Sequence, residues 1–100
     1  MSSQQISGGA GQFQVSGALS FETVTAVLAE SKGKIFSNPV AQIELDLGGV
    51  SRADSAGLAL LLELMRMARA ANVQITFAHL PQQLTAIAMA GDLDMLLPIA

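Results

Sequence analysis

The chain has 100 residues, of which 51% are hydrophobic and 13% are charged, and its net charge is −3. A chain of this length forms a single domain over residues 1–100, and so high an apolar fraction excludes intrinsic disorder. The five basic residues are scattered, which argues against nucleic-acid binding and against electrostatic attachment to anionic lipid. Because there is no cysteine, a disulfide framework and a thiolate metal site are both excluded.

The N-terminal segment has neither the basic region nor the apolar core of a signal peptide. The longest apolar run, 58–62, ends at Glu63, far short of the roughly 20 apolar residues that a membrane span needs. We therefore expect a cytoplasmic protein with no direct membrane insertion, whose action at any membrane would require a partner.

The first part of the chain predicts two strands and a helix. Residues 4–6 and 12–19 predict strands, joined as a hairpin by a flexible turn over 7–11. Ser20 is the predicted N-cap of the helix that follows, and Gly33 is its predicted left-handed C-terminal cap.

The second part of the chain repeats the order of strand and helix. Alternating apolar and polar side chains indicate strands, and runs of strong helix formers indicate helices. We expect a strand over 42–47, a helix over 56–71, a strand over 73–77, a helix from Pro81 to Gly91 and a short turn or helix within 93–99. This order predicts an α/β fold with parallel strand pairs and right-handed crossovers.

The strongest candidate for a functional site is the predicted loop 51–57, which joins a strand to a helix. The loop brings one hydroxyl, that of Ser55, to a helix N-terminus, where negative charge is favoured. Ser55 is predicted to act as an N-cap worth about 1 kcal/mol and, as a further hypothesis, as a partner contact or a switch. A phosphate there would add about −1.5 to −2 charges beside Asp54. Gly57 is expected to allow another backbone to approach closely, and Asp46 to hold the loop by hydrogen bonds.

The helix after this loop has a wide apolar face. Its apolar arc covers about half of the helix, more than the roughly 100° that a surface helix requires. The additional apolar flank consists of Leu60, Leu64, Met67 and Ala71. Two interpretations remain open at this stage. Either a neighbouring helix covers the flank, or the flank is a docking surface continuous with the Ser55 loop.

The residue pattern does not predict catalysis. His79 is the only histidine, and no Gly-x-Ser-x-Gly motif surrounds any serine. The glycine pairs lack the lysine of a nucleotide-binding loop, and no spacing supplies three convergent metal ligands. Phe13 and Phe77 fall at core positions rather than on a stacking platform. We therefore expect no enzymatic activity, no cofactor and no metal.

The strings Leu45-Asp46-Leu47 and Asp54-Ser55-Ala56-Gly57-Leu58, with Gly17-Ala18-Leu19 before them, resemble the STAS family. These small domains occur in anti-sigma-factor antagonists and at the ends of anion transporters. The resemblance covers nearly the whole chain and implies the STAS fold, a small, mixed, mostly parallel sheet with helices packed on it. Residues 50–62 and the Leu-Pro pair near the C-terminus are most similar to the Mla-type branch, the stand-alone STAS subunits of phospholipid-transport ABC complexes.

This resemblance implies a non-catalytic subunit that binds the ATPase subunit of an Mla-type ABC transporter and helps to maintain outer-membrane lipid asymmetry. The alternative is an anti-sigma-factor antagonist whose Ser55 is phosphorylated by a kinase partner. The Mla-type branch usually has threonine at this position, whereas serine is common in the phosphorylated sigma regulators. A small-ligand sensor has no supporting residue. The implied partner-binding residues are Arg52, Asp54, Ser55, Ala56, Gly57, Leu60 and Met67.

Overall fold

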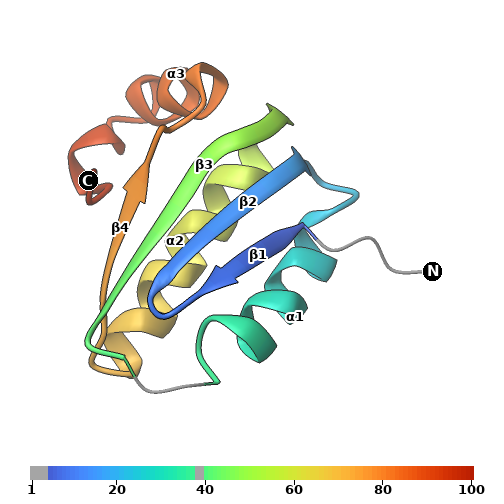
Figure 1. The fold of residues 1–100 in the computed structure, drawn as a ribbon. Coiled ribbons are helices and arrows are strands. Elements are labelled where there is room, and N and C mark those ends of the chain that lie inside the picture. The colour runs from blue at the N-terminus through green and yellow to red at the C-terminus, as the bar shows by residue number, and fades with distance from the viewer. Residues whose placement is uncertain (1–4, 38–39) are drawn as a thin grey trace.

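The computed structural model describes residues 5–37 and 40–100, so Gln4, the first residue of the expected N-terminal strand, lies outside it. The elements in chain order are β1 (Ile6–Gly9), β2 (Gln12–Leu19), α1 (Val24–Lys34), β3 (Gln42–Ala53), α2 (Ser55–Ala70), β4 (Gln74–Ala78), α3 (Gln82–Ala90) and the 3-10 helix η1 (Asp94–Leu96) (Figure 1). This order of strands and helices confirms the prediction. Within the described ranges, no helix is long and apolar enough to cross a bilayer.

The four strands form one sheet in the order β1-β2-β3-β4. β1 and β2 are antiparallel, whereas β3 is parallel to both β2 and β4, as the α/β prediction requires. The turn of the hairpin is only Ala10–Gly11, because both residues adopt the positive φ (55° and 84°) that a two-residue turn of this kind needs. The longer turn expected over 7–11 is therefore wrong, and residues 7–9 belong to β1.

Apolar side chains at alternate strand positions point to the same side of the sheet, which the helices cover (Figure 1). The buried strand residues are Ile6, Phe13, Val15, Leu19, Ile43, Leu45, Leu47, Ile75 and Phe77. The opposite face carries polar side chains such as Gln12, Gln14 and Glu44, which are exposed. The hydrophobic core therefore lies in one layer, between the sheet and the helices.

The ends of α1 differ from the prediction at both termini. Its N-cap is Thr23, whereas Ser20 is buried and closes the turn ahead of the helix. The backbone carbonyl of Ser20 accepts hydrogen bonds from the N–H groups of Thr23 at 2.9 Å and Val24 at 3.0 Å. Gly33 does not adopt the positive φ of a left-handed cap, so the helix continues to Lys34.

The outer edge of β1 is closed by two charged side chains of α1. The Glu30 carboxylate accepts hydrogen bonds from the backbone N–H groups of Gln5 at 3.1 Å and Ile6 at 2.9 Å. Lys34 Nζ donates to the Ile6 carbonyl at 2.8 Å and to Glu30 at 3.0 Å. Burial alone would raise the pKa of Glu30, but these bonds outweigh it and lower the pKa below its ordinary value. Because the outward backbone groups of Ile6 are already paired, this part of the edge resists the addition of another strand.

Candidate partner-binding site

The segment that the sequence predicted as a functional loop, 51–57, is almost entirely regular structure: residues 51–53 belong to β3 and residues 55–57 to α2. β3 continues past its expected end at Leu47 to Ala53, because residues 49–53 pair with residues 16–19 of β2. Only Asp54 then separates β3 from α2. We call residues 52–57 the β3–α2 corner, and its sharpness follows from this one-residue connection.

Asp54, rather than the expected Ser55, is the N-cap of α2. It has extended backbone geometry, and its Oδ1 accepts a hydrogen bond from the Ala56 N–H at 2.9 Å. Its Oδ2 accepts a second hydrogen bond, at 3.2 Å, from the N–H of Phe21 in the connection between β2 and α1. A carboxylate suits this place because it accepts two N–H groups at once and complements the helix dipole. One side chain thus ties together two segments that are 33 residues apart in the sequence.

Ser55 is the first residue of α2 and is exposed. Because Asp54 takes the capping role, the Ser55 hydroxyl is available to a partner. A phosphoryl group on Ser55 would find the N–H of Ala56 already bonded to Asp54 Oδ1, and the N–H of Gly57 bonded to the Asp54 carbonyl at 2.9 Å. It would also be repelled by the Asp54 carboxylate. Phosphorylation would therefore make the corner much more negative, and few free N–H groups would be available to bind the phosphate.

Gly57 is buried and allows the first turn of α2 to lie against the end of β2. A Cβ atom at this position would stand 2.7 Å from the Leu19 carbonyl oxygen and 3.1 Å from Leu19 Cβ. The expectation that Gly57 permits a close backbone approach is confirmed. Its contribution to a binding site is to hold the corner in place, since its own atoms are covered.

Leu60 and Met67 do not form the exposed apolar flank that one of the two interpretations of α2 required. Leu60 is only 5% exposed and Leu64 only 1%, and both belong to the core. Met67 is half-buried and packs against that core, about 16 Å along α2 from Ala56 at 1.5 Å per residue. The structure therefore supports the burial of Leu60 and Leu64, leaves Ala71 exposed beyond the end of α2, and separates Met67 from the corner.

The structure reveals an apolar groove between α1 and α2 that the sequence did not predict. Its volume is about 320 Å³, and its lining residues are Phe21, Val24, Thr25, Leu28, Ala56, Ala59, Leu60 and Glu63. Phe21 is 82% exposed, and little-exposed Leu60 lines the groove from α2. A hydrophobic residue just before a helix often packs onto its first turn, so the position of Phe21 in the sequence does not signal exposure. We call this feature the α1–α2 groove.

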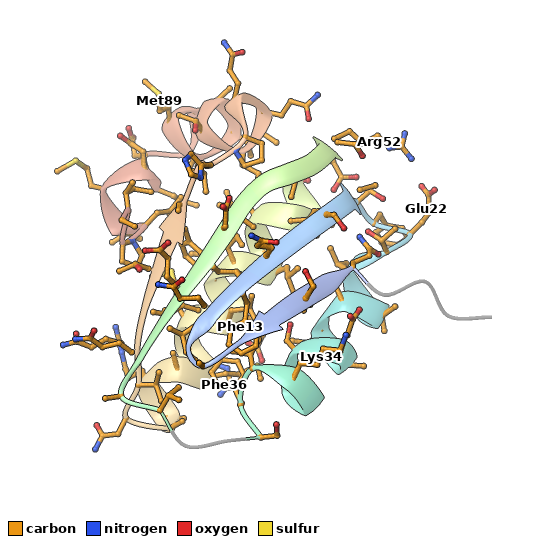
Figure 2. The ribbon with its side chains drawn as sticks, viewed as in Figure 1. Phe13, Glu22, Lys34, Phe36, Arg52 and Met89 are labelled. Atoms are coloured by element: carbon orange, nitrogen blue, oxygen red, sulfur yellow. The ribbon has the colours of Figure 1, made fainter. Side chains whose placement is uncertain are left out.

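Arg52 and Glu22 flank the corner on its solvent side and are both exposed, and Figure 2 shows both side chains extending outward. Arg52 lies near the end of β3, opposite Ala18 of β2. The next residue, Ala53, donates its N–H to Oε1 of Gln83 at 2.8 Å, which connects the corner to α3. The corner is thus fixed to β2, to the β2–α1 connection and to α3, while its outer residues stay accessible.

Asp46 organises a different junction from the one expected. Its Oδ1 accepts a hydrogen bond from the Gly48 N–H at 2.8 Å and lies 3.0 Å from Nδ1 of His79. The Gly48 bond first, and then the His79 bond, lower the pKa of Asp46 below its ordinary value. The expectation that Asp46 holds the 51–57 segment is wrong, because β3 continues well beyond it to Ala53. Within residues 5–37 and 40–100, no group of three or more metal-ligating side chains could hold an ion.

The fold is shared with several solved structures. The anti-sigma factor antagonist SpoIIAA in its unphosphorylated form aligns with a TM-score of 0.72 and 20% identity, over 96% of this chain and 86% of that chain. The phosphorylated form of SpoIIAA from Bacillus aligns with a TM-score of 0.67 and 20% identity, over 96% and 89%. The structure of SLC26A9 aligns with a TM-score of 0.71 and 16% identity, over 82% of this chain and 16% of the larger one.

These identities are low, so the structural likeness shows the fold alone. No curated protein sequence matches the chain significantly. A family model described as "Mlab, STAS domain" matches residues 2–98, nearly the full length. The match includes the Asp54–Gly57 string and the whole helix behind it, so the chain belongs to the STAS domain family.

Proposed function

We propose that this protein is the non-catalytic STAS subunit of an Mla-type phospholipid-transport ABC complex, similar to MlaB. In this proposal it binds the ATPase subunit through the β3–α2 corner and the α1–α2 groove, at the cytoplasmic side of the inner membrane. Binding promotes assembly or activity of the transporter, which maintains lipid asymmetry in the outer membrane. The description of the matching family model supports this branch of the family.

The observation that carries the proposal is the exposure of Phe21 beside the β3–α2 corner, where its N–H donates to Asp54. Full burial of a phenylalanine side chain is worth about 1.5–3 kcal/mol, so an 82% exposed one leaves a large part of that free energy unused. Phe21 also adjoins a groove lined mainly by apolar side chains. An exposed apolar surface of this kind next to a rigid corner is typical of a protein interface.

The mechanism follows from binding alone. Asp54 and Gly57 hold the corner rigid, so the surface is already in its binding geometry and loses little entropy on association. Such a subunit supplies no group to ATP hydrolysis. The subunit binds one conformation of the ATPase more tightly than another and so shifts the equilibrium between them. The ratio of the two affinities is typically about 5–150 for coupled sites.

Purification of the tagged protein from its native host tests this function. We expect an ABC ATPase to be recovered, and we expect Ser55→Arg to lower its affinity for the purified ATPase at least tenfold. Ser16→Arg is the matched control, because Ser16 is an exposed serine on β2, away from the corner. Equal affinity of both variants and the unsubstituted protein would show that the corner is not the binding site.

A second candidate function is favoured by one observation, the exposed Ser55 hydroxyl that plays no part in capping. SpoIIAA, the anti-sigma factor antagonist with the same fold, has been solved in unphosphorylated and phosphorylated forms. In this alternative the chain is an anti-sigma-factor antagonist controlled by a kinase that phosphorylates Ser55. Recovery of a sigma-regulating kinase, with a mass increase of one phosphoryl group on the native chain, would establish the alternative.

A further inference from the structure

We propose that the α1–α2 groove binds a single amphipathic helix of the partner, with apolar side chains in the groove and a basic residue facing Glu22. This inference rests on the proposed function, since it assigns the helix to the ATPase subunit. Beyond the proposed function, it specifies that the binding segment is a helix, that the helix is apolar on one side with a basic residue, and in which direction it runs.

The shape of the groove matches a helix. On α1 its wall is formed by Val24 and Leu28, four residues apart, and on α2 by Ala56 and Leu60, also four residues apart. Residues with this spacing lie one above the other on a helix, so each wall extends over a little more than one turn, and the groove runs along both helices. A partner helix laid along it would insert two anchors that are themselves three or four residues apart. The small side chain of Ala59 leaves room for close approach.

The size of the groove argues against a small-molecule ligand. Its volume of about 320 Å³ lies at the lower end of the range of roughly 300–1,000 Å³ for ligand pockets. Such pockets bury 70–90% or more of a drug-sized ligand, whereas here Phe21 at the mouth is itself 82% exposed. An open groove with an exposed aromatic anchor is suited to a partner that brings its own surface to cover both.

The charges around the groove differ between its two ends. The end at the corner has the carboxylates of Glu22, which is exposed, and Asp54. At the other end Glu63 is neutralised by Arg66 through two hydrogen bonds of 2.8 and 2.7 Å, and Lys32 lies near enough to lower the pKa of Glu63 further. Arg52, which also flanks the corner, leaves that end with one net negative charge from Glu22 and Asp54, whereas Glu63, Arg66 and Lys32 leave the other end with one net positive charge. The corner end is therefore the more acidic one, and a lysine or arginine of the partner is complementary to it.

The direction of the partner helix follows from the fold. α1 and α2 each follow one of two parallel strands, so both helices begin at the same edge of the sheet and present their positive dipole ends at the corner. A helix that runs antiparallel to them places its own negative C-terminal end there. Basic side chains are favoured in the last turn of a helix, which brings them opposite Glu22.

A second copy of this chain is a poorer occupant of the groove. Among the residues that the structure describes, the other large apolar side chains that are exposed are Met89, Met95, Leu96 and Ile99, on and after α3. Asp92 and Asp94 lie among them in the sequence and are exposed. Docking of that surface onto the groove would bring these carboxylates toward Glu22, which is unfavourable.

Photo-cross-linking of the reconstituted complex with the purified ATPase subunit tests the inference directly. A benzoylphenylalanine at position 21 should cross-link to one helical segment of the ATPase that contains lysine or arginine. The same group at position 25 should cross-link one turn nearer to the N-terminus of that segment, and at position 95, the matched exposed control, it should not cross-link. Cross-links to an acidic or non-helical segment, to a second copy of this chain, or equally from position 95 would overturn the inference.

Affinity measurements separate this inference from the function on which it rests. Phe21→Asp should weaken binding of the ATPase about 30-fold or more, as for a central anchor of an interface, while Met95→Asp should not change it. Glu22→Lys should weaken binding about fivefold at low salt and less at high salt, whereas Glu44→Lys on the open sheet face should have no effect. If the unsubstituted protein does not bind the ATPase, the proposed function fails. If it binds and Phe21→Asp binds as tightly, the partnership with the ATPase stands, but the groove is not part of its binding site and the groove inference fails.

Discussion

At two of the three junctions where a strand leads into a helix at the carboxyl edge of the sheet, an aspartate organises the chain, in a different way at each. At the β3–α2 corner, Asp54 accepts two hydrogen bonds, both from backbone N–H groups. At the β4–α3 turn, residues 79–81, Asp46 bonds to one backbone N–H and to the side chain of His79, which is 74% exposed. Asp54 thus joins two backbone segments directly, whereas one of the two partners of Asp46 is a solvent-exposed side chain.

The glycines at the two junctions show the same difference. Gly57 at the corner is packed against the backbone of Leu19, which cannot move without disturbing β2. At Gly48, beside the turn, the atoms nearest to an added Cβ belong to the side chains of Asp46 and His79, at 3.1 Å and 3.4 Å. A rigid corner can present a preorganised binding surface, which is why we place the partner there and not at the turn.

Among the substitutions at the two junctions, Gly57→Ala should lower the stability of the fold most. The added methyl group would stand 2.7 Å from the Leu19 carbonyl oxygen, so α2 must shift away from β2. We expect the free energy of unfolding to fall by about 1–3 kcal/mol, measured by chemical denaturation, together with a loss of partner affinity.

Two other glycines are the controls for this change. Gly48→Ala should destabilise the fold less than Gly57→Ala, because the neighbouring side-chain atoms can move. Gly33→Ala, inside α1 with nothing within 4 Å of the new Cβ, should raise stability by about 0.5–1 kcal/mol. A larger loss at Gly48 than at Gly57 would reverse the contrast between the two junctions.

The next effect should come from Asp54→Ala, which removes the N-cap of α2 and the bond to Phe21. Loss of an N-cap typically lowers the free energy of unfolding by about 1 kcal/mol. We expect faster hydrogen exchange of the Phe21 and Ala56 amides, and weaker partner binding because Phe21 is no longer held. Asp54→Asn keeps one acceptor oxygen, so it should change stability, amide exchange and partner affinity less than Asp54→Ala does. Unchanged exchange at Phe21 would show that the carboxylate does not tie α1 to the corner.

Local sequence patterns predicted the helices and strands whose ends are set by the residues within them rather than by contacts with distant parts of the chain. The loose alternation of apolar and polar residues predicted β2 over Gln12–Leu19 as observed, and the helix predicted over 56–71 matches α2 to within one residue at each end. β3 was predicted too short because Gly48 and Gly49 interrupt its pattern. Its continuation to Ala53 depends on pairing with β2, which lies more than 30 residues earlier in the chain.

The candidate site was located from the sequence, but the roles of its residues were not. Asp54 and Ser55 are both good N-cap residues, and the choice between them depends on the Phe21 N–H, 33 residues away. The burial of Leu60 could not be predicted, because it depends on how α1 packs against α2. Phe21 was missed since a phenylalanine before a helix is as compatible with burial as with exposure.

A smaller effect, on the pH dependence of stability, should distinguish the turn from the corner. The Gly48 N–H, and after it His79, lower the pKa of Asp46 from its ordinary value of 3.8. The stabilisation by the Asp46 carboxylate is therefore complete above pH 3.8 and is lost as the pH falls through the lower pKa of the folded state. Denaturation curves of the unsubstituted protein and Asp46→Asn should differ at neutral pH and converge in strong acid. A difference that grows on acidification would contradict this assignment.

The smallest effect should come from His79→Asn, which tests whether the β4–α3 turn takes any part in binding. His79 has a φ of 55°, a left-handed conformation that asparagine adopts more readily than other non-glycine residues, and the asparagine side chain can still donate to Asp46. We expect the free energy of unfolding to change by less than about 0.5 kcal/mol and the affinity for the partner to stay unchanged. His79→Val should be less stable, because a β-branched residue is strained at this φ. If His79→Asn weakened the partner complex as much as Asp54→Ala does, the partner surface would have to extend from the rigid corner across Gln83 to the turn, and the two junctions would act as one site.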